Sequence, residues 1–139
     1  MEVSALSPDV SIFPFPDLNH LSPLATSLRE LHIDASQMDK VVSLPSQIQH
    51  LNQLRVLEIS QFKNVRLLPE WLGGLTSLVR LEICGLPLVE HLPSQAAMER
   101  LSQLTKLGIR HCPLLIKSCR TPRGSEWEKI KKIRRVLNG

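Results

Sequence analysis

The sequence contains few of the residues by which catalytic and metal sites are usually recognised. It has no tyrosine, two tryptophans and three cysteines in 139 residues. The cysteines are odd in number and show no CxxC spacing, which disfavours both a disulfide framework and a zinc site. This cysteine usage fits a reducing compartment.

Long apolar runs and export signals are also missing. No run of about 18 apolar residues is present to span a membrane, so we expect a soluble chain. The N-terminal residues MEVSALSPDVSIFPFP lack a basic start and a continuous apolar segment, and they do not predict a secretory signal. No Asn-x-Ser/Thr acceptor for glycosylation occurs. Together these absences predict a cytoplasmic location.

The positive charge of the chain is concentrated at its C-terminus. Residues 1–109 hold 8 Lys and Arg against 11 Asp and Glu, whereas residues 110–139 hold 9 against 2. A nucleic-acid interface is expected to combine a basic surface with aromatic stacking platforms, and this chain has no tyrosine and only two tryptophans. The charge distribution therefore favours a solvated basic segment over a nucleic-acid-binding one.

What the chain does contain is an internal repeat. The pattern LxxLxI occurs four times, opening at Leu28, Leu54, Leu78 and Leu104. Leu-Pro pairs follow the first three copies, at Leu44, Leu68 and Leu92, about 24 residues apart. This period falls within the range of roughly 20–29 residues that is typical of leucine-rich repeats.

The repeat predicts both a strand and a helical turn in each copy. LxxLxI alternates apolar and polar residues at its end, as a strand with one buried face requires. The leucines between copies are spaced by three, which predicts a 3₁₀ or helical turn on the outer side, and Gln95–Arg100 is expected to be helical. One such unit cannot bury its own apolar face. Residues 28–119 therefore predict an α/β leucine-rich-repeat solenoid with a curved parallel sheet.

The two ends of the chain differ from this pattern. Residues 1–27 contain four prolines, which predict a degenerate repeat or a loose cap. In residues 120–139, a linker precedes Ser125-Glu-Trp-Glu128, which matches a capping box. Trp127, Ile130, Ile133 and Val136 or Leu137 follow at helical spacing with basic residues between them. We expect a C-terminal amphipathic helix that covers the last repeat, rather than one that lies on a membrane, because its apolar stripe is narrow.

The exposed side of the sheet is the expected binding surface, because its side chains are positioned by rigid strands. The LxxLxI register points a set of mainly polar residues outward, running from acidic through mixed to basic. These candidate protein-binding residues are Glu30, His32, Asp34, Val56, Glu58, Ser60, Arg80, Glu82, Cys84, Lys106 and Arg110, with Gly108 between the last two.

The same register predicts that Glu58 and Glu82 are lateral neighbours, an unfavourable pair unless a cation such as Arg80 compensates it. A solvated sheet face without a partner explains the strip equally well.

No set of residues predicts an enzyme. His111 and Cys112 are adjacent at a strand end and should point to opposite sides, which prevents easy proton transfer between them. Cys112 is expected to pack as a small apolar side chain, and Cys84 is the thiol expected to react. No Ser/His/Asp set or paired carboxylate site is present, and we expect no cofactor and no metal.

Three features resemble one known family. The repeats use Leu-Pro followed by xxLxxL, as in Leu68-Pro-Glu-Trp-Leu-Gly-Gly-Leu75-Thr-Ser-Leu78, and the last repeat reads Leu107-Gly-Ile-Arg-His-Cys-Pro-Leu114. The tail continues with a second cysteine, Cys119, and then Gly124-Ser-Glu-Trp-Glu-Lys-Ile130. These residues resemble the C-terminal end of the leucine-rich-repeat domain of plant nucleotide-binding disease-resistance proteins. The resemblance covers residues 20–137, although the Ile-Pro pair common in the family is replaced by Ile133-Arg134.

The resemblance implies a protein-recognition role in plant defence. The partner would be a pathogen effector, a host protein, or a neighbouring nucleotide-binding domain that the repeats regulate. No phosphate loop of the GxxxxGK[ST] type occurs, so the nucleotide switch of the full receptors is not expected in this chain, which is either a receptor fragment or a gene that retained the repeats alone. The alternatives are an adaptor or scaffold, such as a ubiquitin-ligase substrate receptor, and a truncated receptor remnant.

Overall fold

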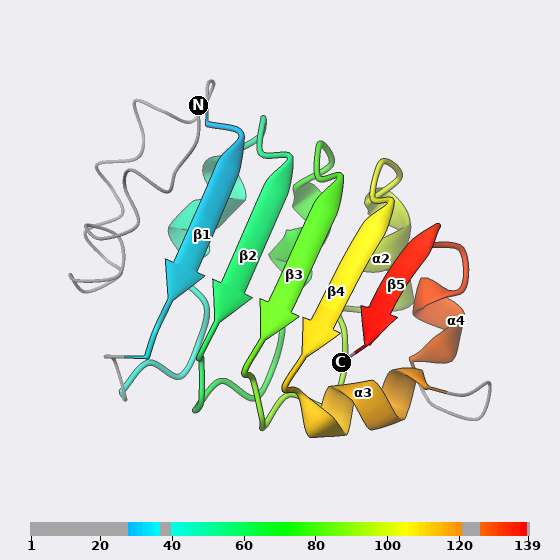
Figure 1. Cartoon of the computed structure of the whole chain (residues 1–139). Coiled ribbons are helices and arrows are strands. Elements are labelled where there is room, and N and C mark those ends of the chain that lie inside the picture. The colour runs from blue at the N-terminus through cyan, green and yellow to red at the C-terminus, as the bar shows by residue number, and fades with distance from the viewer. Residues whose placement is uncertain (1–27, 37–39, 121–125, 139) are drawn as a thin grey trace.

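The protein is an α/β chain in which five parallel strands form a sheet in chain order (Figure 1). The computed structural model describes residues 28–36, 40–120 and 126–138, so the predicted N-terminal unit of residues 1–27 lies outside the described residues. The strands are β1 (Glu30–Asp34), β2 (Val56–Ser60), β3 (Arg80–Cys84), β4 (Lys106–Arg110) and β5 (Arg135–Asn138).

The first four strands lie where the LxxLxI pattern predicts them, and their register follows the pattern as well. Leu31 pairs with Leu57, Leu57 with Leu81, and Leu81 with Leu107. The isoleucines two residues later pair in the same way. All eight of these strand residues are at most 2% exposed, because alternate side chains of a strand point to one face. The predicted alternation is confirmed.

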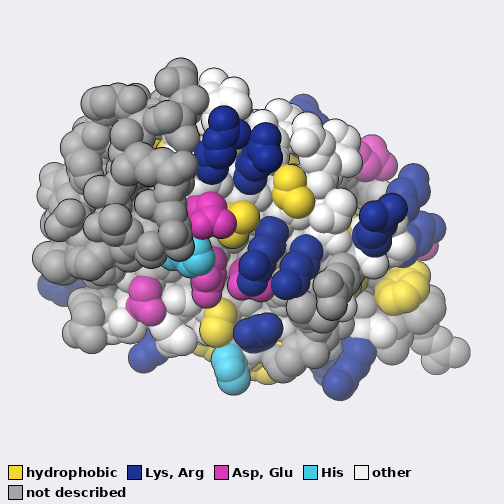
Figure 2. Space-filling model, turned by 45° about the horizontal axis from the view of Figure 1, so that its top comes forward, with side chains coloured by type: hydrophobic (Ala, Val, Ile, Leu, Met, Phe, Trp, Pro, Cys, Tyr) yellow, Lys and Arg dark blue, Asp and Glu magenta, His cyan; other side chains and the backbone are white. Residues whose placement is uncertain are grey.

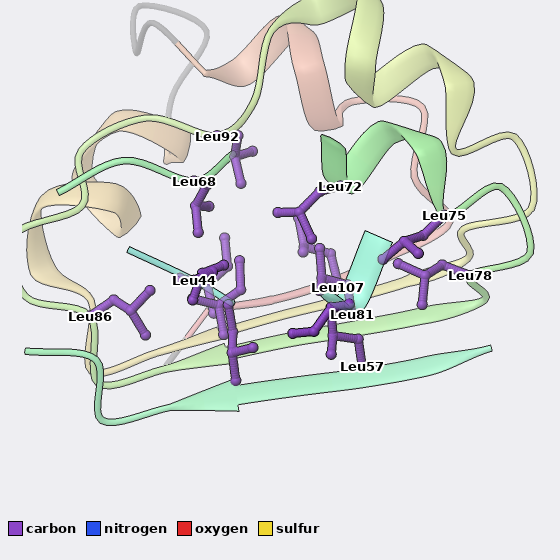
Figure 3. Packing of buried hydrophobic residues seen from close by; sticks show 14 of the residues in the cluster. Leu44, Leu57, Leu68, Leu72, Leu75, Leu78, Leu81, Leu86, Leu92 and Leu107 are labelled. Atoms are coloured by element: carbon purple, nitrogen blue, oxygen red, sulfur yellow. The ribbon is translucent and has the colours of Figure 1, made fainter. Parts of the chain in front are cut away.

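Short helices cover the buried face of the sheet. They are η3 (Ser46–His50), η4 (Glu70–Gly74) and α2 (Gln95–Arg100), each beginning just after a Leu-Pro pair. The predicted 3₁₀ turns and the predicted helix at Gln95–Arg100 are confirmed. Ser94 caps α2, since its hydroxyl accepts a hydrogen bond of 3.2 Å from the Ala97 amide. Leucines from strands, helices and Leu-Pro pairs meet between the two layers (Figure 3).

A turn that the sequence did not reveal follows three of the strands. Gln61, Gly85 and His111 each stand directly after a strand and have positive φ angles of 61°, 71° and 53°. The Gln61 amide donates to the carbonyl of Cys84 over 2.9 Å, and the Gly85 amide donates to Arg110 over 2.9 Å. These hydrogen bonds extend the register of the sheet into the loops.

Two adjacent glycines in η4 provide a matched test of the helical layer. A Cβ atom on Gly73 would lie 2.7 Å from the Ala97 carbonyl oxygen and 2.8 Å from the Ala97 Cα, whereas a Cβ on Gly74 meets nothing within 4 Å. We expect Gly73→Ala to lower the free energy of unfolding by about 1–3 kcal/mol, because η4 and α2 must separate. Gly74→Ala should change it by less than about 1 kcal/mol. Urea unfolding of both variants checks this, and equal effects would contradict the close packing of η4 on α2.

The C-terminal segment departs from the prediction of one amphipathic helix. Helix α4 (Trp127–Ile130) is only four residues long, and Arg135–Asn138 is strand β5, parallel to β4. The predicted helix through Val136 or Leu137 is therefore wrong. The predicted capping box begins at Ser125, outside the described residues, and α4 has no side-chain cap.

The physical reason is that apolar residues spaced by three fit two structures in this chain: an amphipathic helix, and the segment that leads from an outer turn into a strand. Ile130, Ile133 and Val136 repeat the spacing of the leucines that enter β2. The Ile133 amide bonds to the Ile130 carbonyl over 2.9 Å, as the Leu54 amide bonds to Leu51 over 3.1 Å. Val136 then pairs with Leu107 in β4 and packs on the core. The tail thus follows the same path as the earlier copies and extends the sheet.

Helix α3 (Pro113–Cys119), between β4 and α4, was not predicted from the sequence. It begins with proline in its first turn, where a missing amide is tolerated.

Candidate functional site

The outward residues of β1 to β4 form a polar strip on the face of the sheet opposite the helices. The pairing places them in three rows across the strands. The rows are Glu30, Val56, Arg80 and Lys106; then His32, Glu58, Glu82 and Gly108; then Asp34, Ser60, Cys84 and Arg110. Every residue proposed from the sequence therefore lies on this face.

Charge compensation occurs along the middle row. Glu58 and Glu82 are paired neighbours in the register, as predicted. His32 Nδ1 lies 2.6 Å from a Glu58 carboxylate oxygen, and Arg80 Nη2 lies 2.9 Å from Glu82 Oε1. Each carboxylate therefore has its own basic neighbour, which relieves the repulsion expected for like charges side by side. The predicted role of Arg80 is confirmed, whereas the contribution of His32 was not foreseen.

Gly108 gives the strip a shallow hollow. A Cβ atom at this position would lie 3.2 Å from Glu82 Oε1, so the absence of a side chain allows the Glu82 carboxylate to lie over β4. The Glu82 side chain is consequently only 14% exposed. A hollow of about 40 Å³ remains beside it, lined by Glu58, Glu82, Ile83, Cys84, Gly108 and Arg110. This volume suits a water molecule or the tip of one side chain.

Asp34 is fixed in its charged form at the acidic end of the strip. Its carboxylate accepts hydrogen bonds from the Ser36 amide at 2.7 Å and from the Ser60 hydroxyl at 3.1 Å. Partial burial raises the pKa of Asp34, but the hydrogen bonds from Ser36 and Ser60 outweigh it and hold the pKa below its usual range. The carboxylate is therefore available to attract cations over the whole neutral pH range.

The two ends of the strip carry opposite charges. Strands β1 and β2 contribute Glu30, Asp34 and Glu58, whereas β4 contributes Lys106 and Arg110. Neither Lys106 nor Arg110 forms an ion pair with another described residue. Figure 2 shows Lys and Arg side chains directly beside Asp and Glu side chains on this part of the surface. A partner that carries the reverse pattern would be attracted and oriented by it.

The cysteines differ sharply in their surroundings. Cys112 is fully buried and its Sγ lies 3.1 Å from the Arg110 carbonyl oxygen, which confirms the prediction that it packs at the turn. Burial raises the pKa of the Cys112 thiol, and burial together with the charge of Glu126 raises the pKa of Cys119 to about 12. His111, the residue with a positive φ angle directly after β4, precedes Cys112 and is exposed. Cys84, by contrast, is partly exposed on the strip.

These surroundings predict selective thiol labelling. In the folded protein at neutral pH, we expect Cys84 to react with iodoacetamide at least about tenfold faster than Cys112 or Cys119, because the thiolate is the nucleophile and burial suppresses it. Peptide mass spectrometry after timed quenching measures the three rates. Equal labelling of Cys112 before unfolding would show that the turn after β4 is not packed as described.

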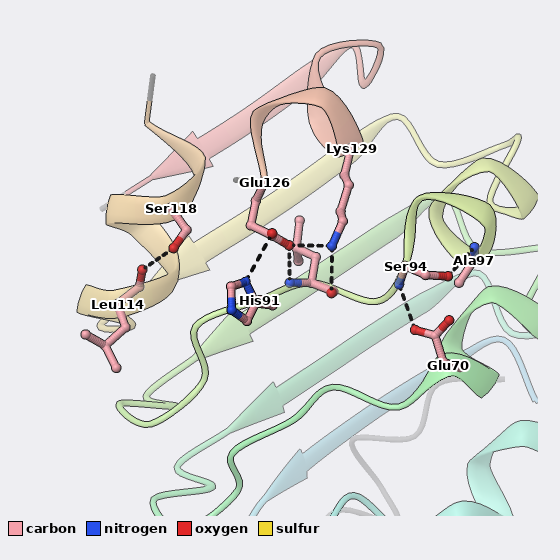
Figure 4. Close-up of polar contacts among 9 residues, drawn as sticks. Glu70, His91, Ser94, Ala97, Leu114, Ser118, Glu126 and Lys129 are labelled. Carbon is pink, nitrogen blue, oxygen red and sulfur yellow. Dashed lines mark hydrogen bonds and ion pairs between the residues drawn. The ribbon is translucent and has the colours of Figure 1, made fainter. Parts of the chain in front are cut away.

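A buried carboxylate that the sequence analysis did not single out as a site holds the C-terminal segment (Figure 4). Glu126 is 2% exposed, and one of its oxygens accepts hydrogen bonds from the Leu92 amide at 2.7 Å and from Lys129 Nζ at 2.8 Å. The other oxygen lies 3.2 Å from His91 Nδ1. Lys129 also donates to the Leu92 carbonyl over 3.2 Å. The acidic-Trp-x-Lys motif thus fastens α4 to the third Leu-Pro pair, which is a structural role.

Other classes of site find little support in the described part of the chain. No group of three His, Cys, Asp or Glu residues there is arranged to hold a metal ion. None of its helices has the length and apolar character needed to cross a membrane. Comparison with models of known protein families gives no match, and no curated protein matches the chain. The polar strip is therefore the best-defined candidate site.

Proposed function

We propose that the chain is a leucine-rich-repeat solenoid that recognises another protein through the polar strip. The observation that carries this proposal is the pair of cations on β4, Lys106 and Arg110, which form no ion pair with any residue that the structure describes. Rigid display lowers the entropy cost of ordering side chains on binding. The hollow at Gly108 adds a place for a partner side chain to enter.

The biological setting rests on the resemblance to plant nucleotide-binding disease-resistance proteins. In that setting the strip contacts a pathogen effector, a host protein or a neighbouring nucleotide-binding domain in the cytoplasm, and no catalysis is involved. The acidic and basic ends of the strip support this role, because complementary charges select the partner and speed association more than they raise affinity.

A photo-crosslinker on the strip tests the proposal. A benzophenone maleimide attached to Cys84 in the intact chain reports on whatever contacts the strip in a plant leaf extract. We expect a discrete crosslinked protein whose yield falls at least about tenfold with Lys106→Glu and Arg110→Glu, since charge reversal repels the acidic part of the partner. The matched control is Lys117→Glu, an exposed cation on α3, which should leave the yield unchanged.

A second probe position controls for nonspecific capture. Gln49→Cys in a Cys84→Ser chain moves the crosslinker to η3, on the opposite layer of the molecule. The same crosslinked protein should not form from this position. A strip probe that yields no discrete product, or a product insensitive to charge reversal on β4, would contradict recognition through the strip.

A further inference from the structure

A line of cations crosses the sheet where its strands begin. Each of the five strands has a Lys or Arg either at its first residue or directly before it. We call these residues the cation row: Arg29, Arg55, Arg80, Lys106 and Arg134. All five are exposed or partly exposed. Because neighbouring strands lie about 4.8 Å apart, the row presents positive charge at regular intervals over about 19 Å.

Few carboxylates lie near the cation row. The segments that lead into β2 to β5 contain seven Lys and Arg and no Asp or Glu; they are residues 51–57, 75–81, 101–107 and 130–136. Glu30, the first residue of β1, is the acidic residue that stands in the row itself, beside Arg29. Positive charge is therefore in excess along the row, most clearly from β2 to β5.

The other carboxylates close to the row already have basic neighbours. Glu58 and Glu82, one row further along the strands, contact His32 and Arg80. At the β5 end, Glu128 pairs with Lys131, and Glu99 and Glu128 share a hollow with Lys129 and Lys132. The remaining members of the row form no ion pair with any residue that the structure describes; they are Arg29, Arg55, Lys106 and Arg134.

Two arginines of the row are lateral neighbours. The Arg55 amide donates a hydrogen bond of 2.7 Å to the Arg29 carbonyl, which places them side by side at the beginning of β1 and β2. Like charges in this arrangement are destabilising. A local arrangement that costs stability is characteristic of functional sites. The pair therefore indicates an anionic partner that comes from outside the described part of the chain.

The spacing of the row restricts the form of that partner. Side chains one turn apart on an α-helix are separated by about 5–6 Å, which is close to the distance between strands. Side chains on one face of an extended segment recur only every 6.6 Å or roughly so, and they would lose step with the row. Val56 and Val79 are half-buried beside the cations and offer apolar contacts. Figure 2 shows hydrophobic side chains between Lys and Arg side chains on this face.

We propose that an α-helix of a partner protein, with one Asp or Glu per turn on one face, lies across the cation row. A helix of about 13 residues covers the length of the row. Glu58 and Glu82 would repel such a helix if it lay further along the strands, so they restrict it to the row. Arg80 and Lys106 belong to both surfaces, so this proposal rests on recognition through the polar strip and names the element that the partner supplies.

A pair of synthetic helices tests the proposal on the full-length chain. The probe is an alanine-based peptide with one glutamate per turn on a single face, and its control has the same composition with the glutamates distributed around the helix. We expect the probe to bind at least about fivefold more tightly than the control, because only its charges match the row. NMR titration measures both affinities, and the shifted amides should belong to the row. Equal affinities would overturn the proposal.

Charge reversal in the row gives a second test. Arg55→Glu and Arg134→Glu should each weaken binding of the probe at least about fivefold. Arg66→Glu is the matched control, because it makes the same change of charge at an exposed arginine that follows β2 at the other end of the strand, and it should have no effect. Urea unfolding should show no loss of stability for Arg55→Glu, since it removes a like-charge pair. Equal weakening by Arg66→Glu would contradict a specific role of the row.

Crosslinking from Cys84 separates failure of this proposal from failure of the polar strip as a binding surface. Arg110 lies on the strip but outside the row. Loss of the crosslinked partner with Arg55→Glu and Arg134→Glu, as well as with Arg110→Glu, supports the row. A partner lost with Arg110→Glu alone would retain the strip and overturn the row. Tighter binding of single-stranded oligo-dT than of the probe helix, abolished by Arg55→Glu, would assign the row to nucleic acid and also overturn the proposal.

Discussion

Leu57→Asp is expected to abolish cooperative folding of the stacked strands, lowering the free energy of unfolding by about 4 kcal/mol or more. Leu57 is fully buried on β2 and pairs laterally with Leu31 and Leu81. A carboxylate there would have no partner, and the lost leucine would also remove contacts to both neighbouring strands. Because each strand is stabilised by the next, the loss should spread beyond β2. Circular dichroism during urea unfolding measures the effect.

Val56→Asp is the matched control for this prediction. Val56 precedes Leu57 on the same strand but faces the polar strip and is partly exposed. The new carboxylate there can be solvated, so we expect a change of no more than about 1 kcal/mol. If both variants were equally stable, the assignment of inward and outward faces on β2 would be wrong.

Glu126→Gln is expected to lower the free energy of unfolding by about 2–3 kcal/mol. The substitution keeps the shape of the side chain but removes the buried charge that meets the Leu92 amide and Lys129 Nζ. Lys129 is only 17% exposed, so its ammonium would keep the Leu92 carbonyl as its remaining buried partner. We expect α4 and β5 to loosen first, which would appear as early loss of amide protection in residues 127–138.

Glu128→Gln provides the comparison for Glu126→Gln. Glu128 is 64% exposed and pairs with Lys131 at the surface. Exposed ion pairs contribute little, so the free energy of unfolding should change by less than about 1 kcal/mol. A stability loss as large as that of Glu126→Gln would show that the general acidity of the tail, and not the contact with Leu92, holds it in place.

The first four strands were predictable from sequence because two independent signals agree in each copy. The alternation of LxxLxI defines which face is buried, and the Leu-Pro pair marks where the outer turn begins. Together they also determine the lateral register of the strands, so the sequence alone predicts that Glu82 is a neighbour of Glu58. The polar strip followed from this register alone.

Apolar residues spaced by three are shared by amphipathic helices and by the leucines of this repeat, so this spacing does not determine the structure of the C-terminal tail. Ile130, Ile133 and Val136 satisfy both readings, and the basic residues between them favoured the helix. The strand is selected over the helix by a tertiary interaction, the pairing of Val136 with Leu107 in β4. The local sequence does not encode this pairing.

Long-range polar contacts escaped prediction for the same reason. Glu126 contacts His91 and the Leu92 amide, which are more than thirty residues away in the sequence. The sequence around His91 and Leu92 contains no pattern that predicts these contacts. The His32 contact with Glu58 also depends on rotamers that the register does not specify. A local signal for the Glu126 contact is the recurrence of Glu-Trp at Glu70 and Glu126, each at the start of a short helix.

Residue-resolved amide exchange with backbone chemical shifts, measured by NMR on the full-length chain, tests most directly whether stacked repeats form one sheet that continues into the tail. We predict extended-strand shifts for Arg135–Asn138 and matching protection of the amides in β2, β3 and β4, because those strands depend on one another. Helical shifts through Leu137, or strands that exchange independently with no shared protection, would contradict the account.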